Sequence, residues 1–248
     1  MAERDGAPAG RRDQRRGRAH EAVTLCAIRV ADLNWFQLEA YLERDDRIVL
    51  PLGSTEQHAY LSLATDAILA ERVSVEAAEP LGVPVLPALA YGVTPYFAAF
   101  PGSPSLGAGT YVALLRDLAS SLRGQGFRRV LLVNGHGGNS FAAEALAADG
   151  VAWHDWWRGP RVWEVVRAID SAGTHASWME NFPWTRLPGV ELPVEAKPEV
   201  GRHSDDPAAV RAQLGDGSYG GPYAHSDKDM LRVWEAGVAE VRAAIERL

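Results

Sequence analysis

The chain has 248 residues, of which 47% are hydrophobic, so it can bury a full core and fits one large α/β domain. Its 25 Lys and Arg residues are outnumbered by 32 Asp and Glu residues, and the net charge of −7 argues against a nucleic-acid or membrane-surface partner and favours a small polar substrate. The single cysteine, Cys26, excludes an intramolecular disulfide and a thiolate metal site, which leaves histidine and carboxylate side chains as metal ligands.

The N-terminal segment, residues 1–22, is predicted to be a disordered arginine-rich tail, followed by a single domain over residues 23–248. The tail has no apolar run that would form the core of a signal peptide. A transit-type presequence is the alternative, and Glu3, Asp5 and Asp13 argue against it. No later segment approaches the roughly 20 apolar residues that cross a bilayer, so we expect a cytoplasmic protein.

Strands and helices are predicted to alternate along the chain. In order, the apolar patterns predict a strand at 47–52, a helix at 66–79, a strand at 83–89, a helix at 110–125, a strand at 130–134, and helices at 141–148 and 228–248. This alternation predicts an α/β fold with a mostly parallel sheet covered on both faces. Ligands of such sheets bind beyond the carboxyl ends of the strands, so the strand-to-loop junctions are the candidate sites.

The loop after the first predicted strand contains three potential metal ligands, Glu56, His58 and Asp66. Imidazole nitrogens and carboxylate oxygens suit zinc, manganese and iron, and the i, i+2 spacing of Glu56 and His58 lets both face one site from an extended segment. The alternative for a lone Glu-x-His is a solvated loop.

The loop after the strand at 130–134 reads Asn134-Gly-His136-Gly-Gly-Asn139. Its glycines let the backbone turn tightly and approach a ligand closely, with His136 in the middle. A phosphate cradle is the alternative, but the loop lacks both the Walker Lys-Ser/Thr pair and the GxGxxG spacing.

Together these loops resemble the creatininase (creatinine amidohydrolase) family. The motifs of that family are matched, in order from about Val49 onward, by Gly53-Ser-Thr-Glu56-Gln-His58, Thr65-Asp66, Tyr91-Gly92, Phe100-Pro-Gly102, Asn134-Gly-His136-Gly-Gly-Asn139 and Gly217-Ser-Tyr-Gly-Gly-Pro222. The resemblance implies a three-layer α/β/α sandwich, usually a homohexamer, that holds two divalent ions and hydrolyses cyclic or simple amides.

The resemblance also implies a ligand set. Glu56, Asp66 and His136 would hold one ion, His58 and Asp66 the second, with Asp66 as the bridge. In creatininase the remaining carboxylate lies two residues after the motif histidine, where this chain has Gly138; other members use a downstream glutamate, which corresponds here to Glu180.

The expected chemistry follows from the metal ions. A water that bridges two divalent ions becomes a hydroxide nucleophile near neutral pH. By family analogy His175 is the candidate acid/base, and its alternative is a hydrogen-bonded surface histidine. Asn139 and the backbone amides of Gly137 and Gly138 are candidates for orienting the substrate or stabilising the oxyanion.

Aromatic residues at several positions bear on the expected pocket. Phe97 stands where family members often have a histidine, which predicts a more hydrophobic pocket wall. Trp178 and Trp184 flank Glu180 and are candidates for lining the pocket, Trp178 by stacking on a substrate ring. The four tryptophans between Trp153 and Trp163 are interpreted as core or interface filling.

Gly138 argues against creatininase activity proper, so the sequence predicts hydrolysis of a formamide, a lactam or another cyclic substrate. A ring-opening carbon–carbon hydrolase of a cyclic diketone is an alternative on the same metal site. A non-catalytic metal-binding accessory protein, acting in the maturation of a peptide-derived cofactor, is the alternative from a different functional class.

Overall fold

The computed structural model describes residues 28–201 and 204–248. The predicted N-terminal tail, residues 1–22, lies outside the described residues, as does Cys26.

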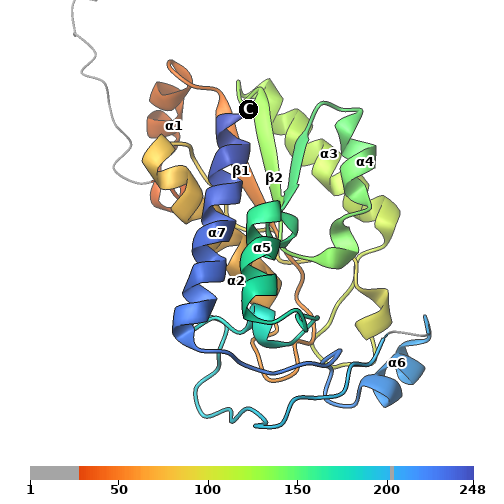
Figure 1. Cartoon of the computed structure of the whole chain (residues 1–248). Helices are drawn as coiled ribbons and strands as arrows, with labels where there is room; N and C mark the ends of the chain where they lie inside the picture. The colour runs from red at the N-terminus through yellow and green to blue at the C-terminus, as the bar shows by residue number, and fades with distance from the viewer. Residues whose placement is uncertain (1–27, 202–203) are drawn as a thin grey trace, which may run out of the picture.

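The central sheet is parallel and is built from β1 (Arg47–Leu52), β2 (Arg129–Asn134) and β3 (Ala152–Asp155), in that spatial order (Figure 1). The segment 83–89 runs beside β1 but joins it only through isolated bridges. The prediction of a continuous strand there is wrong, because Pro84 and Pro87 have no N–H group to donate to a neighbouring strand.

Four predicted helices are confirmed within two residues at each end: α2 (Thr65–Ala78), α3 (Ala108–Gly124), α4 (Ala142–Ala147) and α7 (Asp227–Glu246). Three shorter helices were not predicted: α1 (Trp35–Leu42), α5 (Pro160–Ile169) and α6 (Pro207–Leu214). The start of α1 is fixed by a capping box between Asn34 and Gln37, and that of α6 by the Asp206 side chain, which accepts from the Ala209 N–H.

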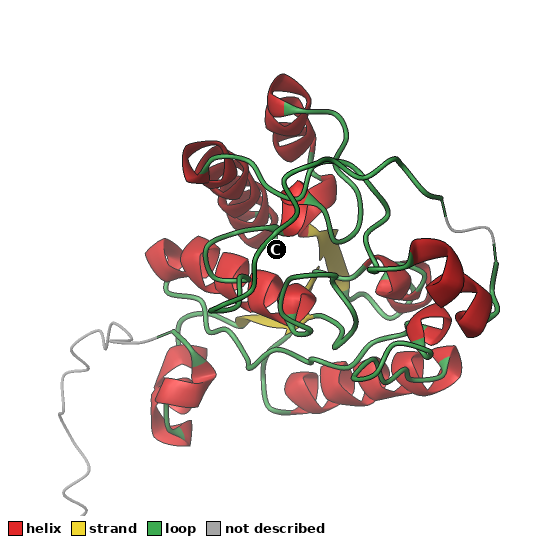
Figure 2. Cartoon of the chain, turned by 90° about the horizontal axis from the view of Figure 1, so that it is seen from below, coloured by secondary structure: helices red, strands yellow, loops and turns green. Residues whose placement is uncertain are grey.

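Alternate residues of the strands face opposite helix layers. Val49 and Leu131 pack in one core with side chains of α2, α5 and α7, whereas Leu50 and Leu132 pack in a second core with α3 and α4. Seen roughly along the strands, helices lie on both sides of the sheet and loops cover its end (Figure 2). The three-layer α/β/α arrangement predicted from the sequence is therefore confirmed.

The start of α2 packs directly against the loop that follows β2. A Cβ atom placed on Gly135 would lie 2.5 Å from the backbone oxygen of Asp66, so a side chain at this position would push the two segments apart. The glycine thus brings Asp66, in the first turn of α2, to the carboxyl end of the sheet.

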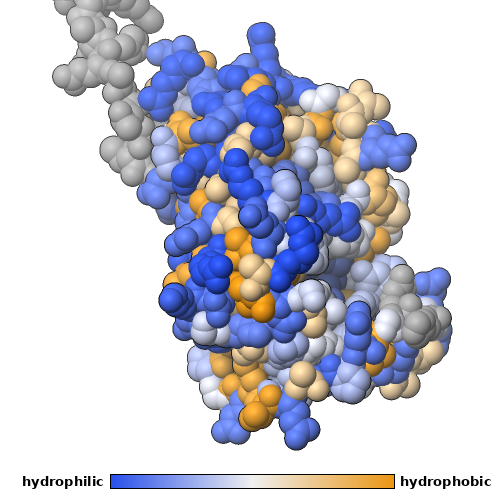
Figure 3. All heavy atoms as spheres, viewed as in Figure 1, coloured by the Kyte–Doolittle hydropathy of each residue, from blue (hydrophilic) through white to orange (hydrophobic). Residues whose placement is uncertain are grey.

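The surface over α5 and α7 is mostly hydrophilic, with a small apolar area beside the lower half of α5 (Figure 3). Within the described part of the chain, none of the helices combines the length and apolar composition that crossing a bilayer requires.

Candidate metal centre

The first group of candidate ligands joins the ends of β1 and β2 to the start of α2. His136 Nδ1 lies 3.3 Å from Glu56 Oε1 and 3.0 Å from Asp66 Oδ2. The three residues are at most 3% exposed, and their candidate ligand atoms all lie within 4.8 Å of one another. This is the trio that the sequence assigns to one ion.

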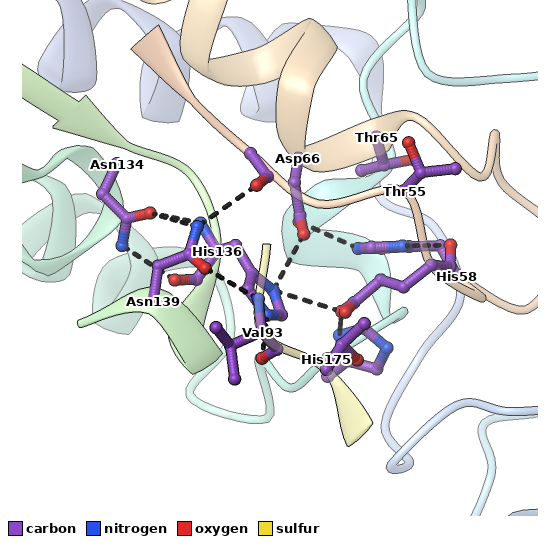
Figure 4. A network of polar contacts seen from close by, with 12 residues as sticks. Thr55, His58, Thr65, Asp66, Val93, Asn134, His136, Asn139 and His175 are labelled. Atoms are coloured by element: carbon purple, nitrogen blue, oxygen red, sulfur yellow. Dashed lines mark hydrogen bonds and ion pairs between the residues drawn. The ribbon is translucent and has the colours of Figure 1, made fainter. Parts of the chain in front are cut away.

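The second group shares Asp66 with the first. His58 Nε2 lies 3.1 Å from Asp66 Oδ1 and 3.7 Å from Glu180 Oε2. Glu180 ends the short 3₁₀ helix η6 (Trp178–Glu180) and is partly exposed. Figure 4 shows Asp66 between the rings of His58 and His136. The two carboxylate oxygens of Asp66 therefore face different histidines, as a bridging ligand requires. We refer to these five candidate ligands, Glu56, His58, Asp66, His136 and Glu180, as the metal centre.

Backbone carbonyl groups fix the orientation of both histidine rings. His136 Nε2 lies 3.1 Å from the Val93 oxygen, and His58 Nδ1 lies 3.1 Å from the Glu56 oxygen. Each ring donates its N–H to the carbonyl and so turns its other nitrogen toward the carboxylates. Hydrogen bonds of this kind orient metal-ligating histidines and select their tautomer.

The electrostatics of this buried cluster favour cations. Burial lowers the pKa of His58, but the charges of Asp66 and Glu180 outweigh this effect and raise it to about 10. The pKa of His136 is also raised, because the carboxylates of Glu56 and Asp66 outweigh the opposing effect of burial. Burial would raise the pKa of Asp66, yet the two histidines hold it well below its usual range. Divalent ions would take the place of the protons on the histidines.

Two buried carboxylate oxygens of the metal centre have no hydrogen-bond donor among residues 28–201 and 204–248. Glu56 Oε2 and Asp66 Oδ2 accept no hydrogen bond, although Asp66 Oδ2 lies at ion-pair distance from His136. Leaving such oxygens unpaired in the interior is costly, and coordination to a cation would satisfy them. Imidazole nitrogens with carboxylate oxygens are ligands for zinc, manganese and iron, so the residues present fit the implied ions.

Gly138 has no room for a side chain. A Cβ atom there would lie 2.2 Å from the Val93 oxygen and 2.4 Å from His136 Nε2. A carboxylate at this position is therefore incompatible with the local packing. The Glu180 carboxylate is instead held by the Ala176 N–H, 2.6 Å from Glu180 Oε2, and Ala176 has a positive φ of 56° that L-residues rarely adopt.

His175 lies beside the metal centre and lines the same cavity. Its Nδ1 is 3.9 Å from Glu56 Oε1, and its ring stacks on Phe97 with centroids 4.9 Å apart. Burial, reinforced by the nearby His58, lowers the pKa of His175 and favours a neutral ring. The expected hydrophobic wall is present here, because Phe97 also lines the cavity.

Asn139 connects the loops beneath the site. Its side chain donates to the Gly53 oxygen and to Asn134 Oδ1, and accepts from the Val93 N–H. It is fully buried and does not line the cavity. Since Val93 in turn orients His136, the contacts of Asn139 are those of a positioning residue.

Of the three residues predicted to contact the substrate, one lines the cavity and two do not. Gly137 lines the cavity, whereas Gly138 and Trp178 do not. The Trp178 side chain is fully buried in the core, with its ring edge-on to His225 at a centroid distance of 4.6 Å. The structure thus brings the five proposed ligands, His175 and Gly137 together and places Trp178 elsewhere.

The cavity has a volume of about 280 Å³, and part of its wall was missed by the sequence reasoning. Three of the tryptophans interpreted as core or interface filling line it, together with an arginine: Trp156, Trp157, Trp163 and Arg158. Trp156, Trp157 and Arg158 directly follow β3, and a strand predicted there would have pointed to them. This four-residue strand was not predicted from the sequence.

The chain is similar in sequence to several curated proteins, including the following three. Creatinine amidohydrolase of Pseudomonas putida is 33% identical over 128 residues, which is 48% of this chain and 49% of that protein. Mycofactocin precursor peptide peptidase of Mycolicibacterium smegmatis is 39% identical over 108 residues, 41% of this chain and 42% of that protein. 3-dehydro-scyllo-inosose hydrolase of Thermotoga maritima is 30% identical over 103 residues, 41% of this chain and 33% of that protein. The matched stretch spans no more than about half of these relatives.

Solved structures match a larger share of this chain than the curated relatives do. The crystal structure of creatinine amidohydrolase (creatininase) superposes with a TM-score of 0.69 at 25% identity, covering 90% of this chain and 98% of that one. A creatininase variant described as the Zn-Zn type has a TM-score of 0.68 at 25% identity, with 89% and 98% covered. The sequence profile of the creatininase family, described as creatinine amidohydrolase, matches residues 31–245. The chain therefore belongs to the creatininase family.

Proposed function

We propose that this protein is a hydrolase that uses two divalent ions to cleave the C–N bond of a cyclic amide, a formamide or a related small polar substrate. The observation that carries the proposal is the buried Asp66 carboxylate, shared by two trios of ligand atoms beside a cavity of about 280 Å³. The family membership and the Zn-Zn form of a related creatininase support it.

In this proposal Glu56, Asp66 and His136 hold one ion, and His58, Asp66 and Glu180 hold the other. Zinc, manganese or iron ions bound there would polarise a substrate carbonyl and lower the pKa of a water molecule. The protein's own contribution is to hold these ligands in a buried place and to aim both imidazole rings by backbone carbonyl groups.

His175 is the residue placed to move a proton. Its Nδ1 faces the metal centre, and its lowered pKa keeps the ring neutral and able to accept a proton near neutral pH. We propose that His175 passes this proton to the leaving nitrogen. The backbone of Gly137, which lines the cavity, is placed to contact the substrate, and Asn139 supports the loops from below.

The substrate is expected to differ from creatinine. Gly138 replaces the carboxylate of creatininase, and Phe97 makes the wall apolar. Two alternatives keep the same metal centre. The similarity to a precursor peptide peptidase favours a role in peptide maturation, and the similarity to an inosose hydrolase favours ring opening at a carbon–carbon bond. Assembly into a homohexamer, a cytoplasmic location and a single domain over residues 23–248 remain predictions from the sequence.

Elemental analysis of the purified protein, combined with hydrolysis assays, tests the proposal. We expect about two divalent ions per chain, as in two-metal sites generally. Asp66→Ala should lose both ions and all hydrolysis of a panel of lactams, formamides and short peptides. Asp170→Ala is the matched control, because Asp170 pairs with His225 and does not line the cavity.

Metal-free protein whose stability and activity toward every panel member do not change on adding Zn²⁺, Mn²⁺ or Fe²⁺ would overturn the enzyme proposal. Metal binding without any hydrolysis would instead favour the accessory role. Hydrolysis of peptides alone would identify the maturation role.

A further inference from the structure

We propose that the substrate carries a carboxylate, or a similar anionic group, and that Arg158 binds it. This inference rests on the proposed function, because it concerns the same cavity. The bond that is cleaved would lie at the metal centre, and Arg158 would bind another part of the same substrate. It makes Arg158 a specificity-determining residue.

Arg158 is placed on the cavity wall by β3. It ends the short 3₁₀ helix η5 (Trp156–Arg158), which starts directly after Asp155, the last residue of that strand. Among the described residues that line the cavity, Arg158 is the only lysine or arginine. The carboxylates that line it, Glu56, Asp66 and Glu180, all belong to the metal centre.

Among the described residues, the guanidinium of Arg158 has a single and long ion pair. Its closest anionic neighbour is Asp155, with Nη1 at 3.4 Å from Oδ2. Asp155 already accepts from Asn134 Nδ2 at 2.8 Å and Trp153 Nε1 at 2.7 Å through Oδ1, and from Ser140 Oγ at 3.1 Å through Oδ2. The aspartate is therefore satisfied by neutral donors and does not require the arginine.

The donors of Arg158 are available to a ligand. Within the described part of the chain, the guanidinium makes only the long ion pair with Asp155 and a contact with the Trp157 ring, 5.6 Å from its centroid. The side chain is 58% exposed, so it can turn from Asp155 toward a bound molecule. A guanidinium has five N–H donors in a planar fork that matches a carboxylate.

The tryptophans define the rest of the ligand. We call Trp156, Trp157 and Trp163 the aromatic wall, since all three line the cavity beside Arg158. Large aromatic surfaces favour a flat or apolar organic body. The combination fits an amide substrate with three parts: a carbonyl at the metal centre, an apolar body on the aromatic wall, and a carboxylate at Arg158.

Ligand binding to the metal-loaded protein tests this without relying on catalysis. The probes are 3-phenylpropanoate and its neutral analogue 3-phenylpropanol, neither of which has an amide bond, and the signal is the fluorescence of the cavity tryptophans. We expect the wild-type protein to bind the carboxylate at least about tenfold more tightly than the alcohol, the effect of a charge-assisted hydrogen bond. Arg158→Gln should abolish this preference without weakening binding of the alcohol.

Arg161→Gln is the matched control, because Arg161 is an exposed arginine three residues further along the chain, at the start of α5, and does not line the cavity. It should retain the preference. A preference that survives Arg158→Gln, as direct binding of the carboxylate to the metal ions would produce, overturns the inference. So does a wild-type protein that binds both probes equally.

A kinetic comparison separates this inference from the proposed function. N-formyl-phenylalanine and its carboxamide differ only in the carboxylate, and we expect Arg158→Gln to raise KM for the former alone. If neither compound nor any other amide is hydrolysed, the proposed function fails, while the fluorescence titration still decides the role of Arg158.

Discussion

The metal centre and the aromatic wall face the same cavity but are held in different ways. Glu56, His58, Asp66 and His136 are almost fully buried, and backbone carbonyl groups fix the rings of both histidines. In contrast, Trp157 and Trp163 are only partly buried and Arg158 is exposed, and of the aromatic wall only Trp156 is buried in the core. We infer that the fold tightly constrains the chemistry of the site, whereas its substrate preference depends on side chains that can change without loss of folding.

The largest effect should come from filling the space at Gly138. Gly138→Ala would force a methyl group against the Val93 oxygen and His136 Nε2, so we expect about 3 kcal/mol lower free energy of unfolding and weaker metal binding. Gly137→Ala is the control, because a Cβ atom there meets nothing within 4 Å, and its effect should stay within about 0.5 kcal/mol. Urea unfolding measures both. Equal stability of the two variants would contradict the tight packing of Gly138 against Val93 and His136.

The sequence predicted the metal centre better than the wall for a physical reason. β1 and β2 are six-residue strands with apolar, buried residues, so their ends, and the loops with Glu56, His58 and His136, could be located. β3 has four half-buried residues, Ala-Trp-His-Asp, without an apolar alternation. Its end, and with it Arg158, could not be located from the pattern.

Trp178 shows a second limit of sequence reasoning. It lies two residues before Glu180 and was expected beside it in the pocket. Because both residues are in the 3₁₀ helix η6, with three residues per turn, their side chains leave the helix in different directions. Glu180 faces the cavity and Trp178 faces the core. The family resemblance pointed to Glu180, which lines the cavity, whereas proximity to Glu180 in the sequence misplaced Trp178, which lies in the core.

Glu180 belongs to the metal centre but is its most exposed member, so its loss should have an intermediate effect. Glu180→Gln removes a charge 3.7 Å from His58 Nε2. It should lower the affinity for one ion by about tenfold to hundredfold and leave the affinity for the other unchanged. Competition with a chelator measures the two affinities. Glu195→Gln, in an exposed loop, is the control. Unchanged affinity for both ions would exclude Glu180 as a ligand.

The smallest effect is expected at Asp216, whose ion pair supports the segment of Tyr219, a cavity residue outside the aromatic wall. Lys197 donates to Asp216 Oδ1, and the Tyr223 hydroxyl donates to Asp216 Oδ2, which fixes the segment that carries Tyr219 against His175. Burial opposes the shift, but Lys197 and Tyr223 hold the pKa of Asp216 below its ordinary value of 3.8.

This pKa shift predicts a pH dependence of folding stability. Because the folded pKa of Asp216 is below the unfolded one, its contribution is fully present above about pH 4 and is lost as the pH falls through the folded pKa. Asp216→Asn should therefore lower the free energy of unfolding by about 1 kcal/mol at pH 7 and by less at pH 3. Urea unfolding of both proteins at the two pH values, with Asp117→Asn at an exposed position of α3 as the control, gives the difference. A deficit that stays constant with pH would show that Asp216 contributes packing and hydrogen bonds but no charge, and that the segment of Tyr219 is held without electrostatic support.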